Sequence, residues 1–332
     1  MTMYLTKQIN GVEICYDECG TADRPALVLL TGWAHDLRLY DELLPFLCPN
    51  YWVIRVCWRG HGPKRDDIDD FGVVEQISDT IGLLDSLEVD KFYLVSHSHG
   101  GWPALGIVDK LGKGRVLCLL MIDQIMTQPP PEFAVGLKAM QEKKTWKAAR
   151  QGLYDNWKAA SDNKAIGNHF IHSFGGFGHK MWALSCRVIA AAYEKYGTPM
   201  RRMEMIENPP LIRHIFSHPL NQPEYRKLHE DLSRKHSWFS FVDLEGETHF
   251  PSLEIPEKVA HQIDQLVQEA DKETVNSNKN YPDSWYRDKP PAMLEWSGDI
   301  KPHFNDVDKA QVADLLGDAE NQPPPHGMRL LL

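Results

Sequence analysis

The stretch Phe92-Tyr-Leu-Val-Ser-His-Ser98-His-Gly-Gly-Trp102 has the character of a buried strand, a tight turn and the start of a helix. Within it, residues 96–100 (Ser-His-Ser-His-Gly) fit the small-x-Ser-x-Gly pattern of a nucleophile elbow. Small residues are needed at Ser96 and Gly100 because bulk there would collide with the neighbouring backbone. The turn presents Ser98 above the end of the sheet and the amide of His99 at a helix N-terminus, where negative charge is favoured. The stretch therefore predicts chemistry at Ser98.

The segments around the elbow predict a mostly parallel sheet. Short apolar runs alternate with helical stretches, which is typical of βαβ units. The first two strands are expected to form an antiparallel hairpin that turns at Asn10-Gly11 and lies at one edge of the sheet. The eight predicted strands are residues 3–8, 11–17, 26–31, 52–56, 92–96, 116–122, 211–217 and 238–244.

Strand signals stop after the sixth strand, and the chain becomes helical and rich in aromatic residues before the sheet resumes. An amphipathic segment at residues 256–267 predicts a last helix, after which the composition turns polar and rich in proline. We therefore expect a core in two parts, residues 1–126 and 209–270, with helices on both faces. A helical cap, residues 127–208, is expected between the two parts, and a Pro-rich tail, residues 271–332, at the end.

Composition excludes several classes of protein. The 332 residues carry a net charge of −10, which argues against a nucleic-acid partner because such binding depends on basic patches. No apolar stretch approaches the ~20 residues of a membrane-spanning helix, and no signal-peptide pattern opens the chain, so we expect a cytoplasmic protein without a membrane partner. The six cysteines form no CxxC pair, and Cys57 and Cys118 lie in strand-like runs, which favours buried thiols in a reducing compartment.

Two further loops complete the expected site. Residues 29–36 (Leu-Leu-Thr-Gly-Trp-Ala-His-Asp) follow a strand, where this architecture places the second oxyanion-hole amide. The amides of Trp33 and His99 are thus expected to converge on one developing negative charge, although Trp33 could instead be a packed aromatic residue. His249 follows the last strand and precedes the last helix, the position of the general base, and this position distinguishes it among fifteen histidines.

The acid partner of His249 is not in its usual place. The segment after residues 211–217 reads His218-Pro-Leu-Asn-Gln-Pro, and its nearest carboxylate is Glu224. Asp123 ends the strand of residues 116–122, one position earlier in the sheet, and is the better candidate to orient His249. A helix cap or a turn residue is the alternative interpretation of Asp123.

These residues resemble one family within the α/β-hydrolase fold, the cofactor-independent 3-hydroxy-4(1H)-quinolone 2,4-dioxygenases. The resemblance covers about residues 1 to 270 and rests on four features. They are residues 32–36 (Gly-Trp-Ala-His-Asp), residues 97–102 (His-Ser-His-Gly-Gly-Trp), Asp123 with His249, and the cap segment around Trp157. Histidines on both sides of the serine, followed by Gly-Gly-Trp, form the most specific part.

The resemblance implies a reaction with dioxygen that needs no metal or flavin. A dyad of His249 and Asp123 would remove the 3-hydroxyl proton of a bicyclic quinolone, and the resulting anion would react with O2 and lose carbon monoxide. The substrate would lie against a set of four aromatic residues, and Ser98 would hydrogen-bond it rather than attack it. This substrate-binding set is His35, His97, Trp102 and Trp157.

Three alternatives stay open. An ordinary serine hydrolase would use Ser98, His249 and Asp123 as a triad on an ester or amide. A non-catalytic binder would reuse the fold as a small-molecule receptor. His97 and His99 form a His-x-His pair that, together with His35, suggests a metal site, yet the histidines that flank an elbow serine point in different directions, which disfavours it. The sequence does not indicate the oligomeric state or the substituent at C2 of the quinolone.

Overall fold

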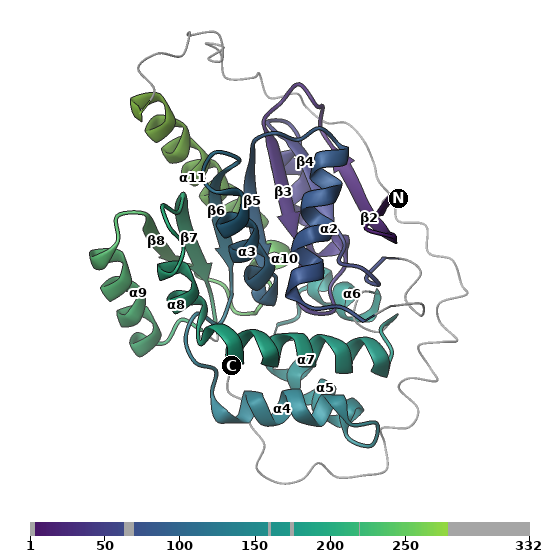
Figure 1. The fold of residues 1–332 in the computed structure, drawn as a ribbon. Helices are drawn as coiled ribbons and strands as arrows, with labels where there is room; N and C mark the ends of the chain where they lie inside the picture. Colours follow the sequence, from purple (N-terminus) through teal and green to yellow (C-terminus); the bar gives the residue numbers. More distant parts are fainter. Residues whose placement is uncertain (1–3, 63–69, 159–160, 173–175, 219, 278–332) are drawn as a thin grey trace.

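An eight-stranded sheet forms the centre of the molecule, and its strands follow the order β1-β2-β4-β3-β5-β6-β7-β8 (Figure 1). The computed structural model describes residues 4–62, 70–158, 161–172, 176–218 and 220–277. The strands are β1 (Leu5–Ile9), β2 (Val12–Cys19), β3 (Ala26–Leu30), β4 (Trp52–Val56), β5 (Phe92–His97), β6 (Val116–Ile122), β7 (Leu211–Phe216) and β8 (Phe239–Asp243). β2 pairs antiparallel with β1 and β4, and the later pairings from β4 to β8 are parallel. The predicted fold class is confirmed.

The hairpin at the edge of the sheet turns where the sequence predicts. Asn10 and Gly11 have φ angles of 51° and 78°, the left-handed pair that a two-residue hairpin turn requires. Ile9 pairs with Val12 directly across this turn. Asparagine and glycine tolerate positive φ better than other residues, so this dipeptide fixes the register of the first two strands.

The central strands are apolar on both faces because helices cover both faces of the sheet. Residues 27–30 of β3 are completely buried. Figure 1 shows α2 and α3 in front of the sheet and α11 behind it. The helical elements of the core are η1 (Leu37–Leu43), α1 (Leu44–Leu47), α2 (Val73–Ser86), η2 (Ser98–Gly100), α3 (Gly101–Leu111), α9 (Pro223–Lys235), α10 (Pro251–Glu254) and α11 (Pro256–Ser277).

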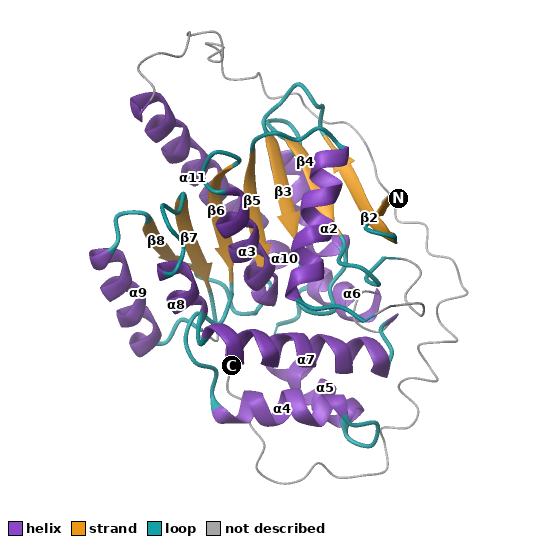
Figure 2. Cartoon of the chain, in the orientation of Figure 1, coloured by secondary structure: helices purple, strands orange, loops and turns teal. Residues whose placement is uncertain are grey.

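Five helices form a cap between β6 and β7, within the segment predicted to be helical. They are α4 (Pro131–Gln141), α5 (Trp146–Lys158), α6 (Lys164–His172), α7 (His179–Tyr196) and α8 (Pro199–Glu204). Figure 2 shows α4, α5 and α7 beyond the end of the sheet toward which the strand arrows point, which is the carboxyl end of the parallel strands. Trp157 and Trp182 of the cap are almost fully buried and belong to the same apolar cluster as the strands. The cap therefore packs directly over the carboxyl ends of the parallel strands.

The last helix is longer than the sequence indicates. α11 begins at Pro256, where the sequence predicts, and continues to Ser277, beyond the predicted end of the helix at residue 267. Ala270 is buried, and the hydroxyl of Tyr93 donates a hydrogen bond of 2.6 Å to Asp271, so packing against the sheet extends the helix beyond its amphipathic part. The predicted Pro-rich tail beyond residue 277 lies outside the described residues.

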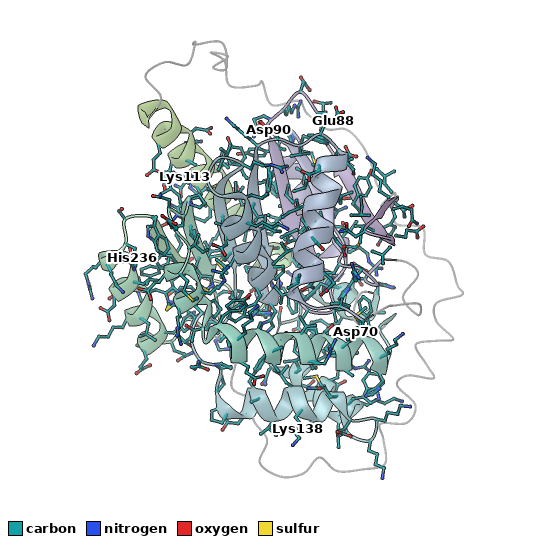
Figure 3. All side chains as sticks on the ribbon, viewed as in Figure 1. Asp70, Glu88, Asp90, Lys113, Lys138 and His236 are labelled. Atoms are coloured by element: carbon teal, nitrogen blue, oxygen red, sulfur yellow. A yellow bond between two sulfur atoms is a disulfide. The ribbon has the colours of Figure 1, made fainter. Side chains whose placement is uncertain are left out.

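Many charged side chains lie on the outside of the molecule, although a few, such as Arg55 and Asp123, are buried. Asp90, Lys113 and Lys138 are exposed, and Figure 3 places them at its periphery. Among the described residues, no helix combines the length and apolar character needed to cross a bilayer.

The cysteines differ in part from the expectation. Cys57 and Cys118 are free and buried, as predicted, and Cys15 and Cys186 are too. Cys19 and Cys48, however, form a disulfide with a Cα–Cα distance of 5.5 Å. Cys19 ends β2 and Cys48 caps α1, so the fold brings together two thiols that lie 29 positions apart in the sequence. The expectation of thiols alone is therefore corrected for this pair.

Candidate active site

The elbow lies at the carboxyl end of β5, in the centre of the sheet. Ser98 has a φ angle of 49°, a backbone conformation that residues other than glycine rarely adopt. Only 4% of the residue is exposed. A Cβ atom on Gly100 would lie 2.2 Å from the carbonyl oxygen of Thr31, so only glycine fits there. This tight contact confirms the need for a small residue at position 100.

Three predicted residues meet at this point, from loops that follow three strands. His249 Nδ1 donates a hydrogen bond of 2.5 Å to Asp123 Oδ2, and the Ser98 hydroxyl donates one of 3.0 Å to His249 Nε2. Asp123, Ser98 and His249 are 0%, 4% and 4% exposed. The geometry is that of a base with an orienting carboxylate on one side and a serine on the other.

Asp123 is positioned by its own backbone and by β7. Its φ angle is 51°, its amide donates to the carbonyl of Ile215, and its Oδ1 accepts a hydrogen bond of 2.9 Å from the amide of Ser217. Glu224, the alternative acid, is exposed in the first turn of α9. The structure therefore places the carboxylate after β6, and not after β7, beside His249.

Burial governs the protonation of this pair. It lowers the pKa of His249 to about 3, so the free imidazole is neutral and able to accept a proton. Burial also raises the pKa of Asp123, while the amide of Ser217 acts in the opposite direction. A water-poor site strengthens the interaction of both groups with any charge that develops on a bound molecule.

The oxyanion loop runs beside the elbow. Ala34 has a φ angle of 52°, and a Cβ atom on Gly32 would lie 3.0 Å from the ring and the carbonyl of His97, so the loop is tightly packed against β5. The amide of Trp33 makes no hydrogen bond within the described residues. The amide of His99 lies in the first helical turn after the elbow, where amides have no partner in the helix. Both are thus available to an anion.

Aromatic rings from the cap enclose the base. The ring of Trp157 stacks on that of His249 with centroids 5.1 Å apart and an interplanar angle of 18°. The amide of His249 also donates to the carbonyl of Trp157, at 3.3 Å. Trp33 contacts Trp157 and Trp182 edge to face, at 5.9 and 5.1 Å. These rings form flat apolar surfaces of the kind that a planar aromatic molecule packs against.

The three other predicted substrate residues are placed differently. His35 stacks at 6.0 Å on Trp157, and its Nδ1 is joined by a hydrogen bond of 2.9 Å to His169 of α6. His97 Nε2 donates to the carbonyl of His249, so this side chain fixes the backbone of the base. Trp102 packs instead on two tyrosines of α7, Tyr193 and Tyr196, between α3 and the cap. The structure therefore does not bring Trp102 to the base.

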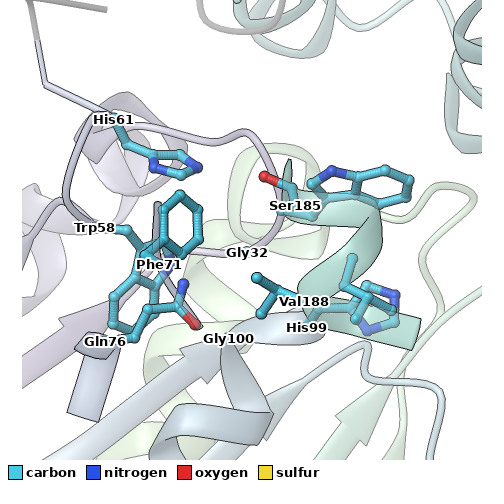
Figure 4. A pocket seen from close by; sticks show the side chains of 11 residues that line it. Gly32, Trp58, His61, Phe71, Gln76, His99, Gly100, Ser185 and Val188 are labelled. Atoms are coloured by element: carbon cyan, nitrogen blue, oxygen red, sulfur yellow. The ribbon is translucent and has the colours of Figure 1, made fainter. Parts of the chain in front are cut away.

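A small cavity of about 20 Å³ lies beside the oxyanion loop, and Figure 4 shows its lining. Gly32, Trp33, His99 and Gly100 form its wall toward the elbow. Its remaining lining residues are Trp58, His61, Phe71, Gln76, Ser185, Val188 and Ile189. This volume suits a molecule of about the size of water, not a bicyclic ring.

Sequence analysis missed four residues that contact the site. Ser217 holds Asp123, His169 bonds to His35, Trp182 packs on Trp33, and Phe250 lies 5.4 Å from the ring of His249. Only Phe250 had a local signal, because it follows the base directly. Within the described part of the chain, no group of three histidine, cysteine or carboxylate side chains is arranged to hold a metal ion.

Comparison with known proteins identifies the family. Residues 27–262 match the model of the alpha/beta hydrolase family. A 2-heptyl-3-hydroxy-4(1H)-quinolone dioxygenase of Mycobacteroides abscessus is 49% identical over 265 residues, 80% of this chain and 98% of the relative. The 1H-3-hydroxy-4-oxoquinoline 2,4-dioxygenase of Pseudomonas putida is 38% identical over 260 residues, 78% of this chain and 98% of the relative.

Solved structures agree with the sequence comparison. An AqdC variant in complex with its substrate, from work on ring cleavage of the Pseudomonas quinolone signal, superposes with a TM-score of 0.78 at 49% identity. The alignment covers 80% of this chain and 100% of that one. The chain therefore belongs to the 3-hydroxy-4(1H)-quinolone 2,4-dioxygenase family of the alpha/beta hydrolases.

Proposed function

We propose that this enzyme cleaves the ring of a 3-hydroxy-4(1H)-quinolone with O2 and releases carbon monoxide. The substrate and one O2 become an N-acylanthranilate and one CO, so all atoms are conserved. The observation that carries the proposal is the hydrogen-bonded pair of His249 and Asp123 under the ring of Trp157, in a chain 49% identical to a quinolone dioxygenase.

The first step is removal of the 3-hydroxyl proton by His249. The neutral imidazole takes the proton on Nε2, and Asp123 on Nδ1 stabilises the imidazolium that forms. The substrate becomes an electron-rich anion that can itself pass an electron to dioxygen. The reducing electrons thus come from the substrate.

The later steps build negative charge on oxygen. After O2 has bonded to C2, the peroxide attacks the carbonyl carbon C4, and an oxyanion develops on the C4 oxygen. In this proposal the amides of Trp33 and His99 donate hydrogen bonds to it. Collapse of the bridged ring then breaks the O–O, C2–C3 and C3–C4 bonds, leaves one peroxide oxygen on C2 and the other on C4, and expels C3 with its own oxygen as carbon monoxide.

Ser98 and the aromatic rings bind the substrate in this proposal. The Ser98 hydroxyl, 3.0 Å from His249 Nε2, lies where it can hydrogen-bond the substrate oxygen whose proton His249 removes. The rings of Trp33 and His35, which both pack on Trp157, supply with it the aromatic contacts for a planar bicyclic ring. Trp102, which packs between α3 and α7, has no part in binding.

One observation favours a serine hydrolase as the second candidate. Ser98, His249 and Asp123 form the hydrogen-bonded sequence that activates a serine for attack on an ester or amide. The two candidates assign opposite roles to Ser98, which is a nucleophile in the hydrolase and a binding group in the dioxygenase.

The deciding experiment measures O2 uptake and carbon monoxide with metal-free protein and a panel of 3-hydroxy-4(1H)-quinolones varied at C2. We expect uptake with equal carbon monoxide, and only a partial loss in Ser98→Ala. No uptake across the panel, together with turnover of an activated ester that Ser98→Ala abolishes, would establish the hydrolase instead. Trp102→Phe serves as a matched control outside the site.

A further inference from the structure

The segment that carries the chain from β6 into the cap is buried, although it belongs to no strand or helix. Its four residues, 123–126, are at most 6% exposed. Buried backbone groups need hydrogen-bond partners, and here side chains of β7, α9 and α7 supply most of them. The bonds run from Gln124 N to His214 Nε2 (3.2 Å), from Tyr225 Oη to Gln124 O (2.6 Å), from Met126 N to Tyr225 Oη (3.0 Å) and from Tyr193 Oη to Ile125 O (3.0 Å).

Two buried histidines extend these contacts into a chain of defined direction. The amide of Gln124 can only donate, so His214 Nε2 accepts, and the single proton of a neutral His214 lies on Nδ1. That proton is donated over 2.8 Å to His229 Nε2, and His229 Nδ1 donates over 2.8 Å to the carbonyl of Tyr225. All four ring nitrogens are therefore used, and each tautomer is fixed.

The chain requires both rings to be neutral. A second proton on either ring would place two donors face to face, at Gln124 N or between the two imidazoles. Burial lowers the pKa of His214 well below its usual value and that of His229 to about 4, in agreement with this requirement. The groups around the rings are the phenol of Tyr225 and the aromatic rings of Phe216, Phe239 and Phe241.

The network fixes the position of a peptide group and does not conduct protons. It ends on a peptide N–H, which exchanges no proton with the base, so it cannot deliver one to His249. What it fixes is the peptide directly after Asp123, a residue in the left-handed region with a φ angle of 51°. A residue in that region stays there only when its surroundings hold it.

We propose that His214, His229 and Tyr225 form a positioning network that holds the peptide between Asp123 and Gln124 and so keeps the Asp123 carboxylate on His249. The network lies on β7 and α9. Its catalytic consequence rests on the proposed function of the dyad. The structural claim, that the network orients Asp123, does not depend on the proposed function.

The first test is the tautomeric state of the two histidines in the intact protein labelled with 15N-histidine. We expect NMR to find both His214 and His229 neutral and protonated on Nδ1 at pH 7. A proton on Nε2 of either ring, or a charged ring, would overturn the network. This measurement needs no substrate.

The second test uses Tyr225→Phe, which removes both hydrogen bonds of the Tyr225 hydroxyl, and His229→Gln, which removes both hydrogen bonds of the His229 ring, each with little change in volume. We expect kcat to fall about tenfold at neutral pH with KM within twofold, because general-base catalysis is typically worth ~10² to 10⁴ and is only partly lost. The defect should shrink at a pH where the substrate ionises unaided. The downfield 1H resonance of His249 Nδ1–H should shift in both variants.

Phe241→Leu is the matched control, since its ring lies 5.5 Å from that of His229 and makes no hydrogen bond. It should lower the melting temperature and leave kcat and the His249 resonance unchanged. If Tyr225→Phe and His229→Gln behave like this control, the network is structural only and the inference is wrong. If the wild-type protein turns over no quinolone, the proposed function fails, and the His249 resonance alone decides the inference.

Discussion

Asp123 and His249 are separated by 126 positions in the sequence, and the fold joins them by a hydrogen bond of 2.5 Å. Each depends on backbone that its neighbours fix: Ser217 holds the carboxylate, and His97 holds the carbonyl of the base. Because burial lowers the pKa of His249 and keeps the free imidazole neutral, the base is able to accept a proton at neutral pH. Replacement of His249 is therefore the most direct single-residue test of its role as the base.

We predict that His249→Ala lowers the rate of quinolone cleavage by ~10² or more at neutral pH, because proton removal then falls to water. The rate should recover in part at high pH, where the 3-hydroxyl group ionises without a base. Asp123→Ala should show a smaller defect of the same kind. Stopped-flow or O2-electrode rates between pH 6 and 10 would measure both.

His261→Ala, on the exposed side of α11, is the control and should keep the wild-type profile. An unchanged rate in His249→Ala would eliminate the dyad. An unchanged rate in Asp123→Ala alone would direct attention back to Glu224.

At the scale of elements, the Cys19–Cys48 disulfide joins the end of β2 to the end of α1. The cross-link closes a loop with a sequence separation of 29, and a loop of this length reduces the entropy of the unfolded chain. We predict that Cys19→Ser lowers the free energy of unfolding by about 3 to 4 kcal/mol in urea titrations without reductant.

Reductant supplies the matched control for this pair. Dithiothreitol should destabilise the wild-type protein and leave Cys19→Ser unchanged. Alkylation of the denatured chain without reductant should modify four of the six cysteines. Modification of all six would mean that the bond does not form.

The elements were largely predictable from local patterns, because each strand of the sheet is a short apolar run with its own boundaries. The elbow and the strand ends then locate Ser98, Asp123 and His249 without any distance information. Contacts between distant side chains leave no such pattern. His35 and His169, which share a hydrogen bond, lie 134 positions apart in the sequence. The sequence around Trp102 likewise does not distinguish a tryptophan packed in the core from one that lines the site.

At the scale of the whole molecule, buried histidines couple folding to pH. Burial lowers the pKa of five histidines outside the dyad: His35, His97, His99, His214 and His229. In the unfolded chain each titrates near 6.5, so below that pH the unfolded state binds more protons than the folded state. Stability is therefore complete above about pH 6.5 and is lost as the pH falls toward 4.

The pH dependence of the free energy of unfolding is expected to be large enough to measure clearly. Each such group changes the free energy of unfolding by up to about 1.4 kcal/mol per pH unit, and the total for a typical domain is only about 5 to 15 kcal/mol. We predict that urea midpoints fall steeply between pH 7 and pH 5, and that His229→Gln makes the slope shallower. His261→Gln should not change the slope because its side chain is exposed. Urea midpoints that do not change with pH would mean that the buried histidines are charged or hydrated in the folded protein. That result would contradict both the enclosure of the site by aromatic rings and the neutral state of His214 and His229 in the positioning network.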